Sequence, residues 1–349
     1  MRAITVLPGK LNSARLEQVV EPSEAEGEIL VRTLAVGICG TDLEIVQGRY
    51  GLAPSLSQRL IVGHEVLGEV LHAPSDSSFR IGDRVVGIVR RPDPIPCPSC
   101  AAGEWDMCRN GLYTECGIKS RHGFASDRFR IEPEFVVKVD PKLGYAAVLT
   151  EPASVIAKAW EQIERIGRRL ADWQPQTVLV TGAGPVGLLA ALLGSQRGLT
   201  VHVFDRATHG PKPLLVNELG GIYHSSPLAN LQLKPDIVIE CTGAASVIVD
   251  AINRTASAGI VCLAGISSGG HKIDIDVGLL NLTMVLENDV IFGSVNANRR
   301  HYEAAAHALS RANPLWLAKL ITRRIAPADW NEAFQRRSDD IKVTIDFTL

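Results

Sequence analysis

Short apolar stretches alternate with turn-forming residues over the first part of the chain. Four runs, Glu28–Val36, Leu60–His72, Arg84–Val89 and Phe135–Val139, carry many β-branched residues and are separated by Pro, Gly and Asp. Runs of this length with such boundaries are typical of strands, and the segment holds no long amphipathic helix. This part of the chain is therefore predicted to be β-rich and loop-rich, starting with a strand at Met1–Leu7.

The pattern changes near Ala153. Ser154–Ile166 carries apolar residues at helical spacing and is predicted to be a helix. From Gln176 onward, apolar β-branched runs alternate with helical stretches. The predicted strands are Thr177–Thr181, Thr200–Phe204, Asp236–Cys241, Ile260–Ala264 and Val290–Val295, and the predicted helices between them are Pro185–Gln196, Ser246–Thr255 and Leu279–Glu287. Such an alternation predicts a doubly wound parallel sheet.

Two further elements are predicted near the end of the chain, a helix around His301–Ser310 and a last strand at Lys342–Phe347. We expect this strand to pair with the β-rich part. The fold class is therefore α/β, with a β-rich catalytic domain at 1–152, a nucleotide-binding domain at 153–297 and a segment at 298–349 that returns to the first domain.

Composition narrows the class of protein. The 349 residues are enough for two domains, and 46% hydrophobic and 21% charged residues are ordinary for a globular chain. The net charge of −2 gives no sign of a nucleic-acid or lipid-surface partner. The longest apolar runs, such as Val186–Leu193, are far shorter than the about 20 residues of a membrane span. With a first strand in place of a signal peptide, we expect a cytoplasmic protein.

A glycine motif predicts a dinucleotide site. Gly182-Ala183-Gly184-Pro185-Val186-Gly187 follows a predicted strand and opens a predicted helix, which is the context that gives G-x-G-x-x-G its meaning. Gly182 makes the tight turn, Gly184 lets the backbone approach a pyrophosphate, and Gly187 permits close packing of helix on strand. The helix N-terminus then faces the phosphates. The alternative is an ordinary glycine turn.

The residues after the later strands indicate which cofactor is used. Asp205 ends the next predicted strand, where a carboxylate binds the ribose hydroxyls and repels a 2′-phosphate. Arg206 beside it can pair with that phosphate. We expect NAD to be preferred and NADP to be usable, although Asp205 could instead be a plain turn residue. Later strand ends that would line the cofactor, unless they are simple turns, are Thr242, Gly265 and Ile266.

Three short segments carry metal-binding side chains. Cys39 lies in Gly37-Ile38-Cys39-Gly40-Thr41-Asp42, His64 and Glu65 follow Gly63, and Glu151 follows Thr150. Thiolate, imidazole and carboxylate are the ligand types that zinc takes. Each residue alone is more simply a core cysteine, a satisfied histidine or an ordinary carboxylate. Together with a dinucleotide motif, they favour a catalytic zinc.

The strings around these residues resemble a known family. Gly63-His64-Glu65-x-x-Gly68, followed by Gly82-Asp83-Arg84-Val85, is similar to the zinc signature of the medium-chain alcohol and polyol dehydrogenases, and the likeness spans essentially the whole chain. It implies a GroES-like catalytic domain, a Rossmann domain and a homo-oligomer, either dimer or tetramer. Strings that resemble the glucose 1-dehydrogenase branch are Val89-Arg90-Arg91-Pro92, Asp106-Met107-Cys108, Glu115-Cys116-Gly117-Ile118, His122-Gly123, Glu151-Pro152 and Gly293-Ser294-Val295-Asn296.

The resemblance also implies roles at the metal. Cys39, His64 and Glu65 become ligands of a catalytic zinc, with Glu151 as a direct or water-bridged fourth. Thr41 matches the start of the family's proton relay, and a route through Glu65 or Glu151 and water is the alternative.

Substrate contacts follow from the branch resemblance. The positions that match contacts to sugar hydroxyls are Glu115, Glu151 and Asn296, and those expected at the cofactor include Ser294 and Asn296. Two positions depart from the branch. Its acidic sugar contact is here Val155, and its asparagine before Arg90 is here Val89, so the identity of the sugar stays open.

A second metal site is suggested by three cysteines in a loop rich in Pro and Gly, at Cys97, Cys100 and Cys108. The family's structural-zinc lobe has four cysteines, but its first position falls on Pro94, which cannot bind a metal. Either Asp93 or Cys116 supplies the fourth ligand, or the lobe holds no metal.

These expectations combine into one activity. We expect transfer of hydride from the C1 hydroxyl of a glucose-like aldose to NAD(P), with zinc polarising the hydroxyl and a lactone as product. Alternatives are a polyol, secondary-alcohol or threonine-type dehydrogenase, a zinc-free quinone or enone reductase, and a non-catalytic nucleotide-binding relative. The intact Cys39 and His64 pair and the intact glycine motif disfavour the last two.

Overall fold

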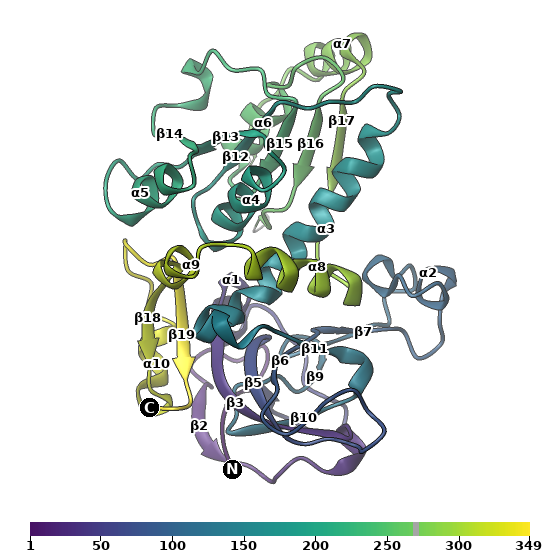
Figure 1. The fold of residues 1–349 in the computed structure, drawn as a ribbon, viewed down its shortest axis with the longest axis vertical. Coiled ribbons are helices and arrows are strands. Elements are labelled where there is room, and N and C mark those ends of the chain that lie inside the picture. Colours follow the sequence, from purple (N-terminus) through teal and green to yellow (C-terminus); the bar gives the residue numbers. More distant parts are fainter. Residues whose placement is uncertain (268–271) are drawn as a thin grey trace. The chain divides into compact units, whose positions relative to one another are not determined.

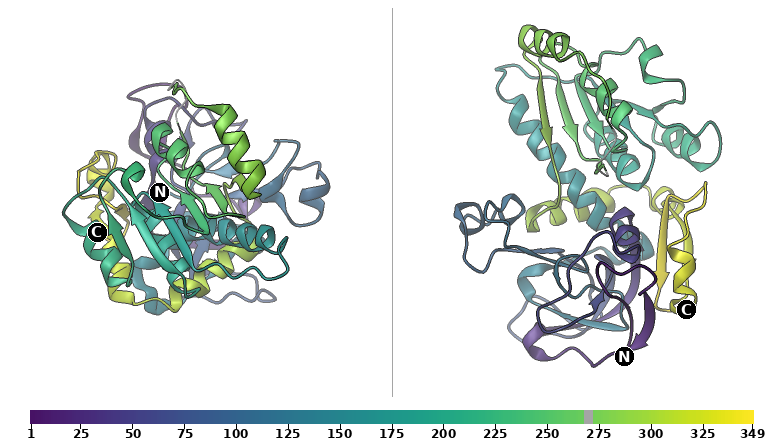
Figure 2. Two further views of the ribbon diagram at one scale, coloured as in Figure 1. Left: turned by 90° about the horizontal axis from the view of Figure 1, so that it is seen from above. Right: turned by 180° about the vertical axis from the view of Figure 1, so that it is seen from behind.

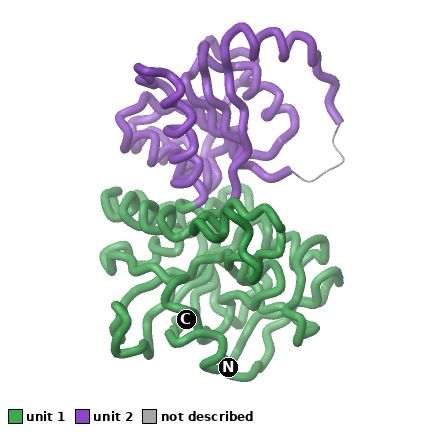
Figure 3. The backbone as a smooth tube through the Cα atoms, turned by 90° about the vertical axis from the view of Figure 1, so that its right-hand side faces the viewer, with its two compact units in different colours: residues 1–154, 296–349 green, residues 155–295 purple. Residues whose placement is uncertain are grey.

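The computed structural model describes residues 1–267 and 272–349 (Figure 1). The chain forms two compact units, one of residues 1–154 with 296–349 and one of residues 155–295 (Figure 3). The α/β fold class is confirmed, since the first unit is rich in strands and the second is built on a parallel sheet. Among the helices of 1–267 and 272–349, none combines the length and apolarity that crossing a membrane requires.

The first unit is built from short strands. They are β1 (Arg2–Val6), β2 (Arg15–Gln18), β3 (Ile29–Ile38), β4 (Leu60–Ile61), β5 (Glu65–His72), β6 (Arg84–Gly87), β7 (Arg90–Arg91), β8 (Thr114–Cys116), β9 (Ser120–Arg121), β10 (Arg128–Ile131), β11 (Val136–Lys138), β18 (Ile321–Ile325) and β19 (Lys342–Asp346). Its helices are α1 (Gly40–Val46), α2 (Pro98–Ala101), α8 (Arg299–Ser310), α9 (Pro314–Leu320) and α10 (Trp330–Ala333), and α3 (Thr150–Gly167) continues into the second unit.

The central strand of the first unit is β3. Eight of its ten residues are buried, as expected for a strand covered on both faces. It pairs with β5, β10 and β19, and in the last ladder Val343 lies opposite Ile38. Figure 2 shows β18 and β19 side by side from behind. The end of the chain is therefore part of the same sheet as the segment that carries Cys39.

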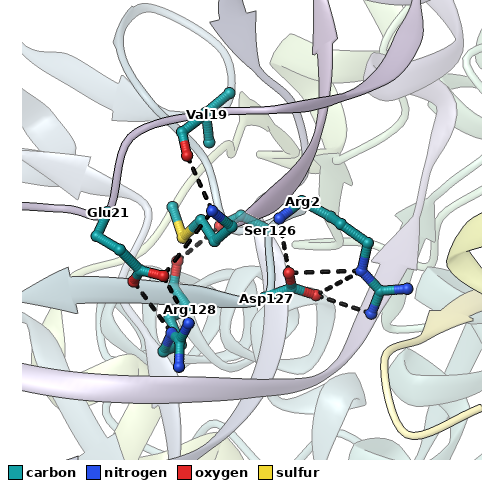
Figure 4. A network of polar contacts seen from close by, with 7 residues as sticks. Arg2, Val19, Glu21, Ser126, Asp127 and Arg128 are labelled. Atoms are coloured by element: carbon teal, nitrogen blue, oxygen red, sulfur yellow. Dashed lines mark hydrogen bonds and ion pairs between the residues drawn. The ribbon is translucent and has the colours of Figure 1, made fainter.

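Polar contacts fix the N-terminal strand (Figure 4). The amino group of Met1 donates to the Val19 carbonyl at 2.9 Å. The backbone N–H of Arg2 and its guanidinium both donate to the Asp127 carboxylate, at 2.6 Å and 2.9 Å. Beside them, Arg128 pairs with Glu21. These contacts hold β1 in register with β2 and with the loop before β10.

The second unit contains a six-stranded parallel sheet in the order β14-β13-β12-β15-β16-β17. Its strands are β12 (Thr177–Thr181), β13 (Thr200–Phe204), β14 (Ile222–His224), β15 (Ile237–Glu240), β16 (Ile260–Leu263) and β17 (Val290–Gly293), and its helices are α4 (Pro185–Ser195), α5 (Pro211–Glu218), α6 (Ala245–Ile252) and α7 (Val277–Glu287).

The strand order of this sheet reverses between β12 and β15. Right-handed crossovers then place α4, which packs on β12 and β13, and α6, which packs on β15 and β16, on opposite faces. Buried residues from four strands and α6 form a core, with Leu179, Phe204, Val238, Ala251 and Val261 among them. Ligands of doubly wound folds bind at the carboxyl ends of the strands at such a switch point.

Two sequence predictions were wrong in detail. The run Leu60–His72 is not one strand, because Gly63 adopts φ +87° and turns the chain between β4 and β5. The helix predicted at Ser154–Ile166 begins earlier, at Thr150, because Pro152 is tolerated in a first turn. Both differences lie at metal-site candidates, His64 and Glu151.

Candidate active site: a metal centre and a dinucleotide turn

Cys39 lies where β3 ends and α1 begins. Its backbone is extended, and it is the N-cap of α1, accepting the Thr41 N–H on Sγ at 3.2 Å. Its own N–H donates to Asp42 Oδ2 at 2.9 Å. This reciprocal capping box explains why a helix starts in a string rich in Gly and Thr. The thiol is therefore held at the N-terminus of α1.

His64 follows the turn at Gly63, where a Cβ would meet Val36 Cγ1 at 2.7 Å, so glycine is needed on steric as well as conformational grounds. The imidazole is 5% exposed. Its Nε2 lies 3.1 Å from Cys39 Sγ, and its Nδ1 lies 3.3 Å from Asp42 Oδ1. A carboxylate behind a ligating histidine fixes its tautomer and its orientation.

Asp42 was not singled out by the sequence reasoning. It is fully buried and contacts both Cys39 and His64. The available signal was its position three residues after Cys39, where a capping-box carboxylate belongs.

Glu65 opens β5 beside His64 and forms a buried ion pair. Both carboxylate oxygens accept from Lys342 Nζ, at 2.7 Å and 2.6 Å, and both side chains are at most 2% exposed. A Cβ on Gly37 would lie 2.1 Å from Glu65 Oε2, so the small residue makes room for the carboxylate. Lys342 comes from β19, far along the chain, and no motif near Lys342 indicated this contact.

Ligand atoms of Cys39, His64 and Glu65 all lie within 4.8 Å of one another. Glu151, in the first turn of α3, is not a member of this cluster but lies near enough to be influenced by it. Burial raises the pKa of Glu151 to about 7, the His64 charge opposes that rise, and Glu65 adds to it.

The electrostatics of the cluster fit a divalent cation. Burial lowers the pKa of His64, but the nearby charges of Asp42 and Cys39 outweigh it and hold that pKa well above its ordinary value. Lys342 offsets part of the carboxylate charge. A buried group of carboxylates with a thiol needs a further positive charge once the thiol and imidazole are deprotonated, and a divalent cation such as zinc would supply it.

Two of the three residues predicted to hold sugar hydroxyls, Glu115 and Asn296, are in contact in the first unit. Glu115 is 6% exposed, and its Oε1 accepts from Asn296 Nδ2 at 2.6 Å and from Arg90 Nε and Nη2 at 3.1 Å and 3.0 Å. Arg90 was quoted only as part of a family-like string, and the sequence reasoning assigned it no role. It pairs with Glu115 in the β7–β8 ladder and lies over the Tyr113 ring at 3.7 Å.

The cysteine lobe also has metal-site geometry. Sγ atoms of Cys97, Cys100 and Cys108 lie within 4.8 Å of one another. The Arg109 amide, donating at 3.4 Å, lowers the pKa of Cys97 to about 6, whereas burial raises the pKa of Cys100 to about 11. The cluster contains neither of the two residues considered as fourth ligands, Asp93 and Cys116.

In the second unit the glycine motif forms the β12–α4 turn. Gly182 has φ +92°, and its N–H donates to the Phe204 carbonyl at 2.6 Å. Gly184 is the N-cap of α4, with Pro185 and Val186 after it. A Cβ on Gly187 would lie 1.7 Å from the Gly182 carbonyl oxygen, whereas one on Gly184 would meet no atom within 4 Å. The helix therefore begins tightly against the turn, with open space at its N-cap, Gly184.

Asp205 follows β13 and is well supplied with donors. Its carboxylate accepts from the Ala183 N–H at 2.8 Å, the Ala207 N–H at 3.0 Å and Lys212 Nζ at 3.1 Å. Burial raises the pKa of Asp205, but these donors outweigh it, and the pKa lies below its ordinary value. Lys212 lies on α5, which the sequence reasoning did not predict, and Arg206 is exposed.

The remaining cofactor candidates lie at strand ends. Thr242 and Gly265 follow β15 and β16, Ile266 is 74% exposed, and Ser294 is buried after β17. Asn296 belongs to the first unit, where its amide binds Glu115.

Two family models match the chain: the alcohol dehydrogenase GroES-like domain over residues 25–141 and the glucose dehydrogenase C-terminus over residues 144–347. Glucose 1-dehydrogenase 2 of Vulcanisaeta moutnovskia is 40% identical over 99% of both chains, and glucose 1-dehydrogenase of Thermoproteus tenax is likewise 40% identical over 99% of both. A solved structure of Haloferax mediterranei glucose dehydrogenase in complex with NADP, Zn and gluconolactone matches with a TM-score of 0.91, at 29% identity over 100% of both chains.

Proposed function

We propose a function from the premise that this chain belongs to the zinc-dependent medium-chain dehydrogenases, in their glucose dehydrogenase branch. Members of this family use Zn²⁺ and a nicotinamide cofactor. The chain oxidises the C1 hydroxyl of a glucose-like aldose to a lactone while NAD(P) is reduced. The observation that carries the proposal is the cluster of Cys39, His64 and Glu65 within 4.8 Å.

The two units have different proposed roles. We assign substrate and metal binding to residues 1–154 with 296–349, and cofactor binding to residues 155–295. Zinc, when bound, lowers the pKa of the substrate hydroxyl. The C1–H bond breaks with its electron pair, which passes as hydride to the nicotinamide ring, and the hydroxyl proton leaves to solvent.

The residues around the cluster handle the proton and hold the sugar. Thr41, in the first turn of α1 beside the Cys39 ligand, is the proposed start of the proton relay. Glu151 is the alternative, because a pKa of about 7 lets it exchange protons near neutral pH. Glu115 and Asn296 bind sugar hydroxyls, and Arg90 orients the Glu115 carboxylate.

For the cofactor, we propose that NAD is preferred and NADP is also used. Asp205 supports NAD, because a carboxylate after this strand binds the ribose hydroxyls. Lys212 supports use of NADP, because it pairs with Asp205 and reduces the repulsion that a 2′-phosphate would meet.

A structural zinc in the cysteine lobe is also proposed. Three thiols within 4.8 Å supply most of a tetrahedral site. Elemental analysis is expected to find two zinc ions per chain, and one per chain would contradict this second site.

Two proposals concern the assembled protein. We propose a homo-oligomer, because α7 presents an apolar surface with no buried residue of its own. We also propose a cytoplasmic location, because all seven cysteines lie in the described residues as free thiols, which fits a reducing compartment.

Initial rates with a panel of aldoses, polyols, secondary alcohols and threonine, each with NAD and NADP, test the activity. An aldose is expected to give the highest efficiency, with lactone as product and with loss of rate on chelation. Cys39→Ser is expected to lose zinc and activity, whereas the control Cys262→Ala, within β16 of the other unit, keeps both. Full activity of Cys39→Ser without zinc would contradict the metal role, and a polyol or simple alcohol as best substrate would favour that alternative.

A further inference from the structure

A buried carboxylate lies at the carboxyl edge of the parallel sheet. Glu240 is the last residue of β15 and is fully buried. An ionised carboxylate in such a place is stable only if enough donors surround it. Those donors come from segments that the dinucleotide motif also uses.

The contacts of Glu240 connect two strand ends. Oε1 accepts from Thr181 Oγ1 at 3.1 Å, which is the last residue of β12. Oε1 also accepts from the Thr242 N–H at 2.7 Å and from the Thr242 hydroxyl, and Gly243 N–H lies 3.1 Å from Oε2. One side chain therefore joins the residue before Gly182 to the loop after β15.

A third strand end is held in the same place. The Gly265 N–H donates to the Glu240 carbonyl at 2.8 Å, and a Cβ on Gly265 would meet Glu240 Oε2 at 2.7 Å and Gly243 N at 2.3 Å. Glycine is required there because the carboxylate and the loop after β15 leave no room for a side chain.

The position of Glu240 coincides with the switch point of the sheet. Strand order reverses between β12 and β15, and Glu240 bridges these two strands at their carboxyl ends. Ligands of doubly wound folds bind in the crevice that opens at this point. Thr242, a cofactor candidate, gives its hydroxyl hydrogen to Glu240 and accepts from the Ala244 N–H at 3.0 Å. The Thr242 hydroxyl therefore forms contacts within the loop after β15.

We propose that Glu240 is a positioning residue for the dinucleotide: its carboxylate holds the Gly182 turn and the Thr242-Gly243 loop at the spacing the cofactor requires, and the Gly265 turn packs against it. It acts through these backbone segments and does not touch the reacting atoms. The inference rests on the proposed function only in taking the bound dinucleotide to be NAD(P).

The chain offers a matched control at the other end of the same strands. Asp236 precedes β15, and its Oδ2 accepts from the Gln176 N–H at 2.8 Å, the Thr177 N–H at 2.8 Å and Thr177 Oγ1 at 2.9 Å. It joins β12 to β15 as Glu240 does, but at the amino edge of the sheet. If both carboxylates only stabilised the fold, replacing either one would have the same effect on cofactor affinity.

The experiment compares full-length Glu240→Ala, Glu240→Gln and Asp236→Ala. NADH and NADPH dissociation constants are measured by titration without sugar, together with thermal unfolding and the KM values of cofactor and sugar. Glu240→Ala is expected to raise the cofactor dissociation constant and KM at least tenfold while the sugar KM changes less than twofold. Glu240→Gln keeps the shape and Oε1 and is expected to recover most of the affinity. Asp236→Ala is expected to stay within twofold of wild type, although it lowers the unfolding temperature.

Two results would overturn the inference: wild-type cofactor affinity in folded Glu240→Ala, or an equal loss in Asp236→Ala. If Glu240→Ala does not fold, Glu240→Gln decides the matter: its amide nitrogen cannot accept from the Gly243 N–H as Oε2 does, so cofactor affinity is expected to fall two- to threefold while Asp236→Asn keeps that of wild type, and unchanged affinity in Glu240→Gln would overturn the inference. Absence of nucleotide binding by the wild type would instead contradict the proposed function, together with everything built on it. Loss of sugar turnover with intact nucleotide binding contradicts only the proposed substrate.

Discussion

Asp42 illustrates how a single buried side chain prepares a metal ligand. Its Oδ2 accepts from the Cys39 backbone N–H, and its Oδ1 lies 3.3 Å from His64 Nδ1, so one carboxylate orients both ligands. Because the pKa of His64 is raised well above its ordinary value, protons compete with the metal for the imidazole. Zinc affinity is therefore expected to fall as the pH is lowered, with release of bound metal.

Replacement of Asp42 tests this arrangement. Asp42→Ala is expected to weaken zinc binding by roughly 10- to 100-fold, the usual effect of losing the partner behind a ligating histidine. Asp42→Asn, which keeps an oxygen for the Cys39 amide, is expected to lose less. Competition with a chromophoric chelator measures both, with Glu44→Ala on the same helix as control. Wild-type affinity in folded Asp42→Ala would contradict the role.

Lys212 makes cofactor selectivity testable at one residue. It pairs with Asp205 at 3.1 Å, and without it the carboxylate keeps its ribose-binding oxygens but repels a 2′-phosphate more strongly. Lys212→Met is expected to lower kcat/KM for NADP about tenfold more than for NAD, which corresponds to about 1.4 kcal/mol. Lys234→Met, at an exposed lysine of the same unit, is the control. An unchanged ratio in Lys212→Met would show that the ion pair plays no part in selectivity.

At the scale of elements, the β12–α4 turn separates packing from ligand binding. Gly187 has no space for a methyl group, since a Cβ would lie 1.7 Å from a carbonyl oxygen, whereas Gly184 has ordinary φ and open space. Gly187→Ala is expected to lower the free energy of unfolding by about 1–3 kcal/mol. Gly184→Ala is expected to leave unfolding nearly unchanged but to raise the cofactor dissociation constant at least tenfold, because the methyl group occupies the approach to the phosphates.

Chemical unfolding and nucleotide titration of both variants measure these effects. Each variant is expected to change one of the two measurements and to leave the other unchanged, so each serves as the control for the other. If Gly184→Ala bound nucleotide normally, the turn would have no role in holding the phosphates.

Elements with a strong local pattern could be predicted from the sequence, and others could not. The parallel strands are continuous runs of β-branched residues, and the helices between them carry apolar residues at helical spacing. Both patterns can be recognised in the sequence alone. The segment of α5 contains Pro211 and Pro213, and α1 begins with Gly40 and Thr41, so neither shows a helical pattern. In both cases capping and tertiary packing outweigh weak propensity.

For the whole molecule, the limit of sequence reasoning is distance along the chain. The motifs indicated Cys39, His64 and Glu65, which the fold brings within 4.8 Å. Lys342 reaches Glu65 only because β19 pairs with β3, and Arg90 reaches Glu115 only through the β7–β8 register. Such charge partners depend on long-range pairing and on burial, neither of which a single sequence displays.

At the scale of the whole molecule, the exposed surface of α7 makes the proposed assembly testable. Helix α7 is apolar on all sides, and its large side chains Val277, Leu279, Leu282, Val285 and Leu286 are each at least 55% exposed. The strand that follows, β17, is the last of its sheet among the described residues, which therefore provide no partner strand at this edge. An apolar helix beside a free edge is typical of a surface that a second copy covers.

If the proposed oligomer forms through this surface, two charges placed on it are expected to dissociate the oligomer. The double variant Val285→Asp and Leu286→Asp places unpaired carboxylates where apolar side chains would meet. Burying them is expected to weaken association by several kcal/mol, which is enough to separate the subunits. Sedimentation velocity is expected to show an oligomer for wild type and a monomer for the variant, while the control Leu214→Asp, at an exposed leucine of α5, leaves the oligomer intact. A monomeric wild type, or an unchanged oligomer in the double variant, would mean that this helix is not the contact surface.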